Sequence, residues 1–145
     1  RANNPFFDRL LQKGRNTLNS DFYPKGAQGA KAILRALKRG DNLALLVDQK
    51  MNDGIAVPFL GRDAMTAPAV AELALRYNCP VVPARVERLK GAHFRVTFYP
   101  PIDRPETGNQ QQDILVMMTE INRQLGEWIK EKPAQWLWVH NRWPD

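Results

Sequence analysis

Apolar residues recur every three or four positions in several stretches of the chain, and this spacing predicts amphipathic helices. The clearest stretch covers residues 27–39, where one face is apolar and the opposite face carries lysine and arginine. Gly40 is a typical residue just beyond a helix end. An earlier helix is predicted to begin at Asn4 and Pro5, with the asparagine as cap and the proline in the first helical position, and to end near Arg15.

Two more helices are predicted further along the chain. Thr66 is a suitable cap for a helix with Pro68 in its first turn and Asn78 at its end. The last and longest helix runs from about residue 110 to residue 132, where Pro133 interrupts it. Its apolar residues are spaced four, three, four and three apart, which is typical of a helix packed on a core. They are Ile114, Met118, Ile121, Leu125 and Trp128.

Short apolar runs between these helices predict β-strands. Residues 42–47 are expected to form a strand buried on both faces, and residues 55–60 a second strand that ends in a turn. Residues 80–87 form a third strand, and residues 94–99 alternate between apolar and polar as a strand does. The turn at residues 90–91 makes the last two a hairpin or a pair of neighbouring strands. This alternation of helices and strands predicts an α/β fold in which helices flank a mixed sheet.

The composition indicates a single globular domain with a basic surface. The chain has 145 residues, of which 43% are hydrophobic, and a formal net charge of +6 at pH 7. The charge favours an acidic partner such as anionic lipid, an acidic protein or nucleic acid, and the alternative is a set of solvated basic side chains. Cys79 is the single cysteine, so no disulfide forms within the chain. The longest apolar run, residues 43–47, is far shorter than the roughly 20 residues that span a bilayer.

Candidate binding residues follow the first two predicted strands, because ligands of α/β folds bind where strands end and loops begin. Asp48 and Gln49 form an acid-amide pair that can orient hydroxyls, amines or an arginine, and the alternative is a turn in which Asp48 caps local backbone groups. Gly61 permits a sharp turn and close approach of the backbone to a ligand. Arg62 would then meet a phosphate, and the alternative is an ordinary turn with a solvated arginine.

Neither histidine is predicted to be catalytic. His93 is expected to be a surface residue near a turn. His140 and Asp145 spell His-x-x-x-x-Asp, but Pro144 disfavours the helical turn that would bring the carboxylate back to the imidazole. The chain also has no Gly-x-Ser-x-Gly, P-loop, Cys-x-x-Cys or Gly-x-Gly-x-x-Gly motif.

Several segments together resemble the lipid A late acyltransferases of the lauroyl- and myristoyl-transferase type, within the glycerolipid acyltransferase superfamily. Each is weak alone, and their order and spacing carry the resemblance along nearly the whole chain. They are Arg1 to Pro5, Lys25-Gly26, the helix end at residues 34–40, Asp48-Gln49, Gly54 to Arg62, Ala64, Thr66, Val82-Pro83, Pro133 to His140 and Arg142-Trp143.

The resemblance implies transfer of a fatty acyl chain from acyl carrier protein to a hydroxyl of a Kdo-bearing lipid A precursor, a step of lipopolysaccharide biosynthesis. The family works at the cytoplasmic face of the bacterial inner membrane, and its general base is the histidine of a His-x-x-x-x-Asp/Glu motif. That motif would lie before Arg1. We therefore expect residues 1–145 to be the C-terminal part of one acyltransferase domain, with a fold incomplete at its N-terminus and no activity alone.

The resemblance also implies roles for particular residues. Arg62 would meet an anionic headgroup, and Leu60 replaces a phenylalanine that is frequent in the family. The expected partners are acyl carrier protein as donor, the lipid A precursor and the inner-membrane surface, with no metal and no dissociable cofactor. The residues expected to line the acceptor pocket are Asp48, Gln49, Phe59, Gly61 and Thr66, and Arg1 and Arg15 would also face the phosphorylated acceptor.

Two other functions remain open from the sequence. One is a catalytically inactive module that binds anionic lipid or acyl carrier protein. The other is a basic nucleic-acid-binding domain, which we do not favour because most aromatic residues fall on core-like faces and no DNA- or RNA-binding motif is present.

Overall fold

The computed structural model describes Phe6, Arg9, residues 13–14, 21–23, 26–139 and 141–143. The chain divides into two compact units, Arg1–Ala44 and Leu45–Asp145.

The first unit contains helix α2, Ala27–Lys38, which confirms the helix predicted for residues 27–39. Gly40 follows with a φ of 84°, a conformation that favours glycine, and its N–H donates to the Leu37 carbonyl at 3.0 Å. Of the helix predicted near the N-terminus, Phe6, Arg9, Lys13 and Gly14 are helical, while Asn4, Pro5 and Arg15 lie outside the described residues.

The second unit begins with an antiparallel hairpin of β1, Lys50–Phe59, and β2, Arg62–Thr66. The register shifts between Lys50 and Ile55, since both of these residues face Thr66. Such a bulge leaves extra residues in one strand and bends it. The strand predicted for residues 55–60 is thus confirmed. The turn predicted after it is present at Leu60 and Gly61, and Arg62 already belongs to β2.

Helix α3, Ala69–Tyr77, follows the hairpin. The prediction that Thr66 caps this helix was wrong: Pro68 is the cap residue, and no side chain caps the helix by a hydrogen bond. Thr66 is instead the last residue of β2, where its hydroxyl is buried. The predicted stop at Asn78 is confirmed, and this residue adopts the left-handed conformation that ends many helices.

A second antiparallel hairpin joins β3, Ala84–Lys90, to β4, His93–Phe98. Gly91 has a φ of 58° in the connecting turn. The apolar side chains of Val86, Val96 and Phe98 share one face of this hairpin and are exposed. The opposite face carries charged residues that contact the last helix.

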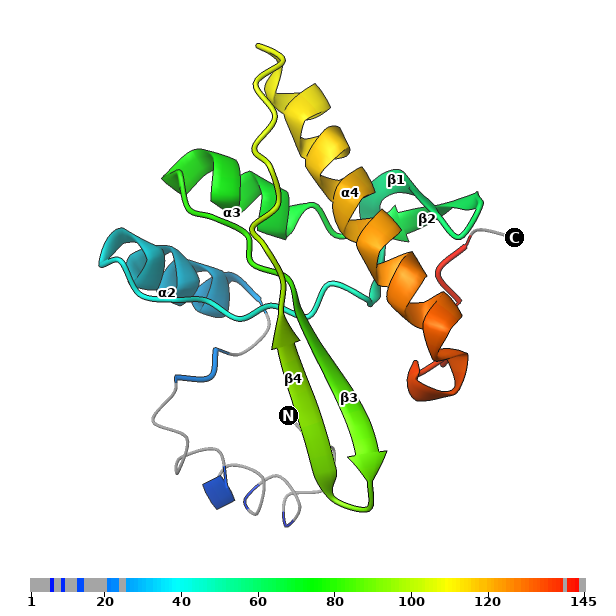
Figure 1. Cartoon of the computed structure of the whole chain (residues 1–145). Helices are drawn as coiled ribbons and strands as arrows, with labels where there is room; N and C mark the ends of the chain where they lie inside the picture. Colours follow the sequence, from blue (N-terminus) through cyan, green and yellow to red (C-terminus); the bar gives the residue numbers. More distant parts are fainter. Residues whose placement is uncertain are drawn as a thin grey trace. The chain divides into compact units, whose positions relative to one another are not determined.

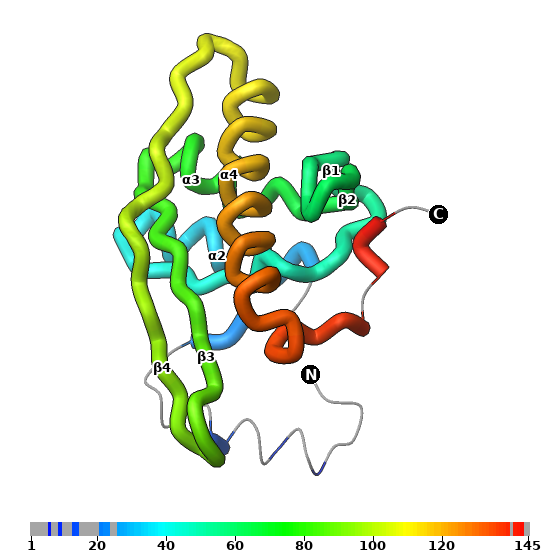
Figure 2. Tube along the Cα trace, turned by 45° about the vertical axis from the view of Figure 1, so that its right-hand side comes forward, coloured from blue at the N-terminus to red at the C-terminus, as the bar shows by residue number. Residues whose placement is uncertain are grey.

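Helix α4, Gln110–Glu131, runs between the two hairpins (Figures 1 and 2) and is followed by the 3₁₀ turn η1, Pro133–Gln135. Asn109 caps its start, because its side-chain oxygen accepts from the N–H groups of Gln111 and Gln112 at 2.9 and 3.2 Å. This confirms the long helix predicted for residues 110–132. None of the described helices combines the length and the apolar character that a bilayer-spanning segment requires.

The predicted α/β class is confirmed, but the sheets differ from the predicted arrangement. The described strands form two separate two-stranded antiparallel sheets rather than one mixed sheet. Residues 42–47 have no regular secondary structure, so the strand predicted there was wrong. Within the described residues no segment pairs with them, and a strand requires such a partner for its backbone groups. Leu46 is 82% exposed rather than buried.

Two apolar clusters lie along α4. The larger joins β1 and α3 to the middle of α4, and the smaller joins the hairpin β1–β2 to the end of α4. The larger contains Val57, Ala71, Ala74, Met117, Met118 and Ile121, and the smaller contains Phe59, Ala64 and Ile129 with Trp136 and Trp143 packed against them. Trp136 and Trp143 thus take part in core packing.

Charged side chains connect β3 to the end of α4. Lys132 donates to Glu87 at 2.6 Å, and Arg85 pairs with Glu131 at 2.6 Å. The hydrogen bond from Lys132, followed by the charges of Arg85 and Lys132, holds the pKa of Glu87 below its ordinary value, although burial opposes the shift.

This lowered pKa predicts a pH-dependent contribution to stability. Glu87 stabilises the fold above the pKa of an unfolded glutamate, about 4.3, and the contribution is lost as the pH falls through the lower folded pKa. We expect Glu87→Gln to be less stable than the original chain at neutral pH, and the difference to shrink below about pH 4. Urea denaturation between neutral and acidic pH measures this, with Glu106→Gln in an exposed loop as control. An equal difference at all pH values would contradict it.

Candidate functional site

The predicted site residues gather around the hairpin β1–β2, but they differ in exposure. Asp48 is half-buried and Gln49 is exposed in the bend before β1. Gly61 and Arg62 are exposed at the hairpin turn. Phe59 is only 2% exposed and Thr66 is fully buried, so neither presents its side chain to a ligand at the surface. Their direct contact with an acceptor stays a prediction.

The hairpin turn consists of Leu60 and Gly61, whose φ angles are 52° and 86°. Two positive φ values in a two-residue loop are what a type I′ turn requires, and they explain the glycine at position 61. Nothing lies within 4 Å of where a Cβ on Gly61 would be. The turn therefore leaves the Gly61 backbone open to a ligand, beside the exposed Arg62.

A buried polar cluster lies behind this turn, formed by Thr66, Asn122 and Arg142. Arg142 donates from Nη2 to Thr66 Oγ1 at 2.8 Å and to Asn122 Oδ1 at 3.4 Å. Asn122 Nδ2 donates to the same threonine oxygen at 3.2 Å, and the Thr66 hydroxyl donates to the Ala64 carbonyl at 2.9 Å. All three polar residues are fully buried. We call them, with Phe59, the Arg142 cluster.

Aromatic rings enclose the Arg142 cluster. The guanidinium carbon of Arg142 lies 4.2 Å from the centroid of the Phe59 ring, a short cation-π contact. Trp143 stacks on Phe59 at 5.6 Å, and Trp136 meets it edge-on at 5.7 Å. The backbone is fixed as well, since Trp143 Nε1 donates to the Phe59 carbonyl at 3.1 Å and Met65 N–H donates to the Arg142 carbonyl at 3.1 Å. Trp136, Arg142 and Trp143 thus pack against the hairpin β1–β2, and two of them are hydrogen-bonded to it.

Arg142 is unusual in its electrostatics. Its Nε and Nη1 atoms are buried without a hydrogen-bond partner among the described residues. Burial lowers the pKa of Arg142, because a charged group loses its hydration, and the charge of Asp48 acts in the opposite direction. Of the sequence-predicted residues, Phe59 and Thr66 contact Arg142 directly, whereas Asp48 acts on it through its charge alone.

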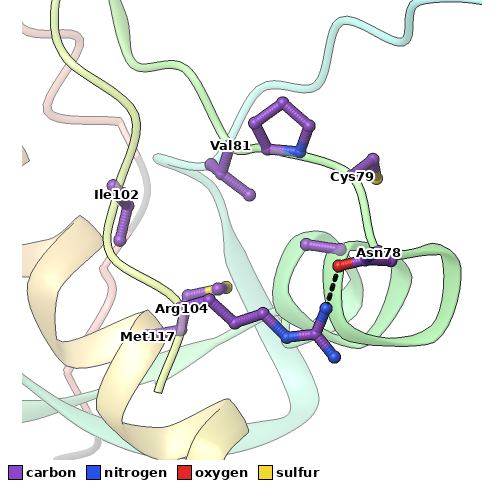
Figure 3. A pocket seen from close by; sticks show the side chains of 8 residues that line it. Asn78, Cys79, Val81, Ile102, Arg104 and Met117 are labelled. Atoms are coloured by element: carbon purple, nitrogen blue, oxygen red, sulfur yellow. Dashed lines mark hydrogen bonds between the residues drawn. The ribbon is translucent and has the colours of Figure 1, made fainter. Parts of the chain in front are cut away.

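A separate pocket of about 280 Å³ lies between the end of α3 and the start of α4. Figure 3 shows Arg104 reaching across it to Asn78, whose side-chain oxygen it meets in a hydrogen bond. The walls are mostly apolar, and none of the predicted site residues lines it. The lining residues are Ala74, Asn78, Cys79, Pro80, Val81, Ile102, Arg104 and Met117. In the described part of the chain, no group of three or more histidine, cysteine or acidic side chains is arranged to hold a metal ion.

Comparison with known protein families shows to which family the chain belongs. The family described as bacterial lipid A biosynthesis acyltransferase matches residues 1–145. The chain belongs to this family. No curated protein matches the chain. The resemblance inferred from the sequence is confirmed at this level, and it makes the chain part of an acyltransferase family of lipid A biosynthesis.

Two members of the buried Arg142 cluster, Arg142 and Asn122, were missed by the sequence analysis. Arg142 belonged to the closing segment of the resemblance, but its burial beside Thr66 depends on a contact 76 residues apart in the chain. Asn122 left a local signal, because it follows the apolar Met118 by four residues on a helix face that is otherwise buried and apolar. A polar residue at such a position indicates a buried hydrogen-bond partner.

Proposed function

We propose that this chain is the acceptor-binding part of an enzyme that transfers a fatty acyl chain from acyl carrier protein to a hydroxyl of a Kdo-bearing lipid A precursor. The observation that carries the proposal is the family match over residues 1–145. The position of Asp48 agrees with it, since a half-buried carboxylate can accept a hydrogen bond from a hydroxyl of the acceptor.

The reaction needs a base that we do not assign to this part of the chain. The acceptor oxygen attacks the thioester carbonyl, so that a C–O bond forms, the C–S bond breaks and the proton of the hydroxyl passes through a general base to the leaving thiolate. The resemblance assigns this role to a histidine in a His-x-x-x-x-Asp/Glu motif. His93 is exposed at the start of β4, and the residue five positions later is Phe98. His140 lies outside the described residues.

The basic character of the chain supports the proposed partners and location. Acyl carrier protein is acidic, and the cytoplasmic face of the inner membrane carries anionic lipid. A net charge of +6 favours encounters with both. We accordingly place the enzyme at that membrane surface, with acyl carrier protein as the acyl donor.

An acyl-transfer assay tests the proposed function. The complete open reading frame that encodes this sequence is expressed and supplied with acyl-acyl carrier protein and the Kdo-bearing lipid A precursor. We expect acyl transfer, and we expect Asp48→Asn to lower kcat/KM for the acceptor by about tenfold or more through loss of a charge-assisted hydrogen bond. Asp53→Asn, an exposed acid on β1, is the matched control and should keep the original value.

The possible failures separate the alternatives. If the protein binds the precursor or acyl carrier protein but transfers no acyl group, it is an inactive binding module and not an enzyme. Salt-sensitive binding of DNA without binding of either partner would favour a nucleic-acid-binding domain. Equal kcat/KM values for the Asp48→Asn variant and the original chain would show that Asp48 does not belong to the acceptor site.

A further inference from the structure

Arg142 is a buried cation, and among the described residues only one of its three guanidinium nitrogens finds a hydrogen-bond partner. Nη2 donates to Thr66 and Asn122, whereas Nε and Nη1 are buried without a partner among the described residues. A guanidinium carries five N–H donors, and leaving buried donors of a charged group unpaired is costly. The face of Phe59 compensates only in part for the lost hydration. The geometry therefore requires an acceptor, preferably a carboxylate, for the two free nitrogens.

Asp48 is the acidic side chain that the fold brings to this place. Lys50, two residues after Asp48, faces Thr66 across the hairpin, and Thr66 is the hydrogen-bond partner of Arg142. Asp48 is also the acidic residue whose charge acts on Arg142. Within the described part of the chain, the structure records no hydrogen bond or salt bridge at its carboxylate. The carboxylate is thus available to move onto the arginine.

Exposure decides which of the two residues meets a ligand. Arg142 is fully buried, so a molecule arriving from solvent does not reach it, whereas Asp48 is half-buried and reachable. A second anion on Arg142 is disfavoured by the negative charge of Asp48. The group that Asp48 meets is therefore a hydrogen-bond donor such as a hydroxyl, not a phosphate.

We propose that Arg142 is a positioning residue of the acceptor site: when the Asp48 carboxylate moves onto its Nε and Nη1 groups, these groups hold it in the orientation that receives an acceptor hydroxyl. This inference rests on the proposed function, which identifies the acceptor. Thr66, Asn122 and Phe59 fix the guanidinium in turn, which gives the buried residues of the predicted site a role without direct contact to the ligand.

A double-mutant cycle tests the pairing without any substrate. Asp48→Asn, Arg142→Met and the double variant are compared by urea denaturation, with Arg142→Met chosen because replacing a buried ionic group by an apolar one of similar length is often tolerated. We expect the stability change of the double variant to differ from the sum of the single changes. The cycle of Arg142→Met with Asp53→Asn should be additive. Additive changes in both cycles would overturn the pairing. If Arg142→Met does not fold, Arg142→Lys takes its place in the cycle.

The acyl-transfer assay then tests the positioning. We expect Arg142→Met to raise the acceptor KM about tenfold, to leave the KM for acyl-acyl carrier protein unchanged, and to add little to the effect of Asp48→Asn in the double variant. Arg142→Lys keeps the charge but cannot donate two parallel hydrogen bonds to one carboxylate. Its acceptor KM should therefore lie between that of the original chain and that of Arg142→Met. An unchanged acceptor KM in a folded Arg142→Met variant would overturn the role. If the original chain transfers no acyl group, the proposed function has failed, and the urea cycle still decides whether Arg142 holds Asp48.

Discussion

Replacement of Phe59 by alanine is expected to lower the free energy of unfolding by about 3–5 kcal/mol, the range for a large aromatic residue removed from a core. Phe59 is 2% exposed, and two tryptophan rings and a guanidinium group pack against its ring. Trp143 stacks on it, Trp136 meets its edge, and the Arg142 guanidinium lies 4.2 Å from its centroid. Alanine would leave a cavity and would deprive a buried cation of its aromatic face, so two costs add.

Urea denaturation followed by tryptophan fluorescence measures this loss, because Trp136 and Trp143 contact the replaced ring. Phe98→Ala is the matched control: Phe98 is 72% exposed on β4, and its removal should change stability by no more than about 0.5 kcal/mol. Similar losses for the two variants would mean that Phe59 is not the centre of the smaller apolar cluster.

Local spacing in the sequence was sufficient to predict the helices. The stretch 27–39 corresponds to α2 and the stretch 110–132 to α4, because the apolar period and the end residues of a helix lie within a few positions of each other. The strands predicted for residues 80–87 and 94–99, as a hairpin or as neighbours, correspond for the same reason to the hairpin of β3 and β4.

The wrong predictions share a different cause: the conformation of these residues depends on partners far away in the sequence. Thr66 has the side chain of a good helix cap, but it pairs with β1 and accepts hydrogen bonds from Asn122 and Arg142. Residues 42–47 have the composition of a buried strand, yet the described chain offers them no strand to pair with. The turn at Gly61 was predicted, but Leu60 was assigned to the strand rather than to this turn, since leucine rarely adopts a positive φ.

The site was predictable only in its outline. Asp48 was named from its place after a predicted strand and from the resemblance, and Phe59 and Thr66 from the resemblance. The structure brings Phe59 and Thr66 into contact with Arg142, and the charge of Asp48 acts on it. Asp48 is accessible, whereas Phe59 and Thr66 are buried because the C-terminal residues pack on the hairpin. No local sequence pattern predicts this packing. The burial also changes their chemistry, because Phe59 and Thr66 act on Arg142 and only Asp48 can meet a ligand.

Gly54→Ala is expected to destabilise the chain by about 3 kcal/mol, at the upper end of the usual cost of overpacking. A Cβ at this position would lie 2.3 Å from the Thr66 carbonyl oxygen and 2.9 Å from that of Met51. Both atoms belong to the backbone of the β1 bulge or of its partner strand, so neither can move without opening the hairpin. The strain would fall on Thr66, the residue that holds Arg142 by a hydrogen bond of 2.8 Å.

Gly126→Ala distinguishes this backbone clash from simple crowding. A Cβ on Gly126 would meet only the end of the Leu60 side chain, at 3.2 Å, and that side chain can rotate away. Alanine also favours the helix over glycine by roughly 0.5–1 kcal/mol, so the variant should be close to the original in stability. Thermal and urea denaturation of the two variants measure the contrast. Comparable stability of the two would show that the bulge relaxes freely, and the Thr66 contact would then not depend on glycine at position 54.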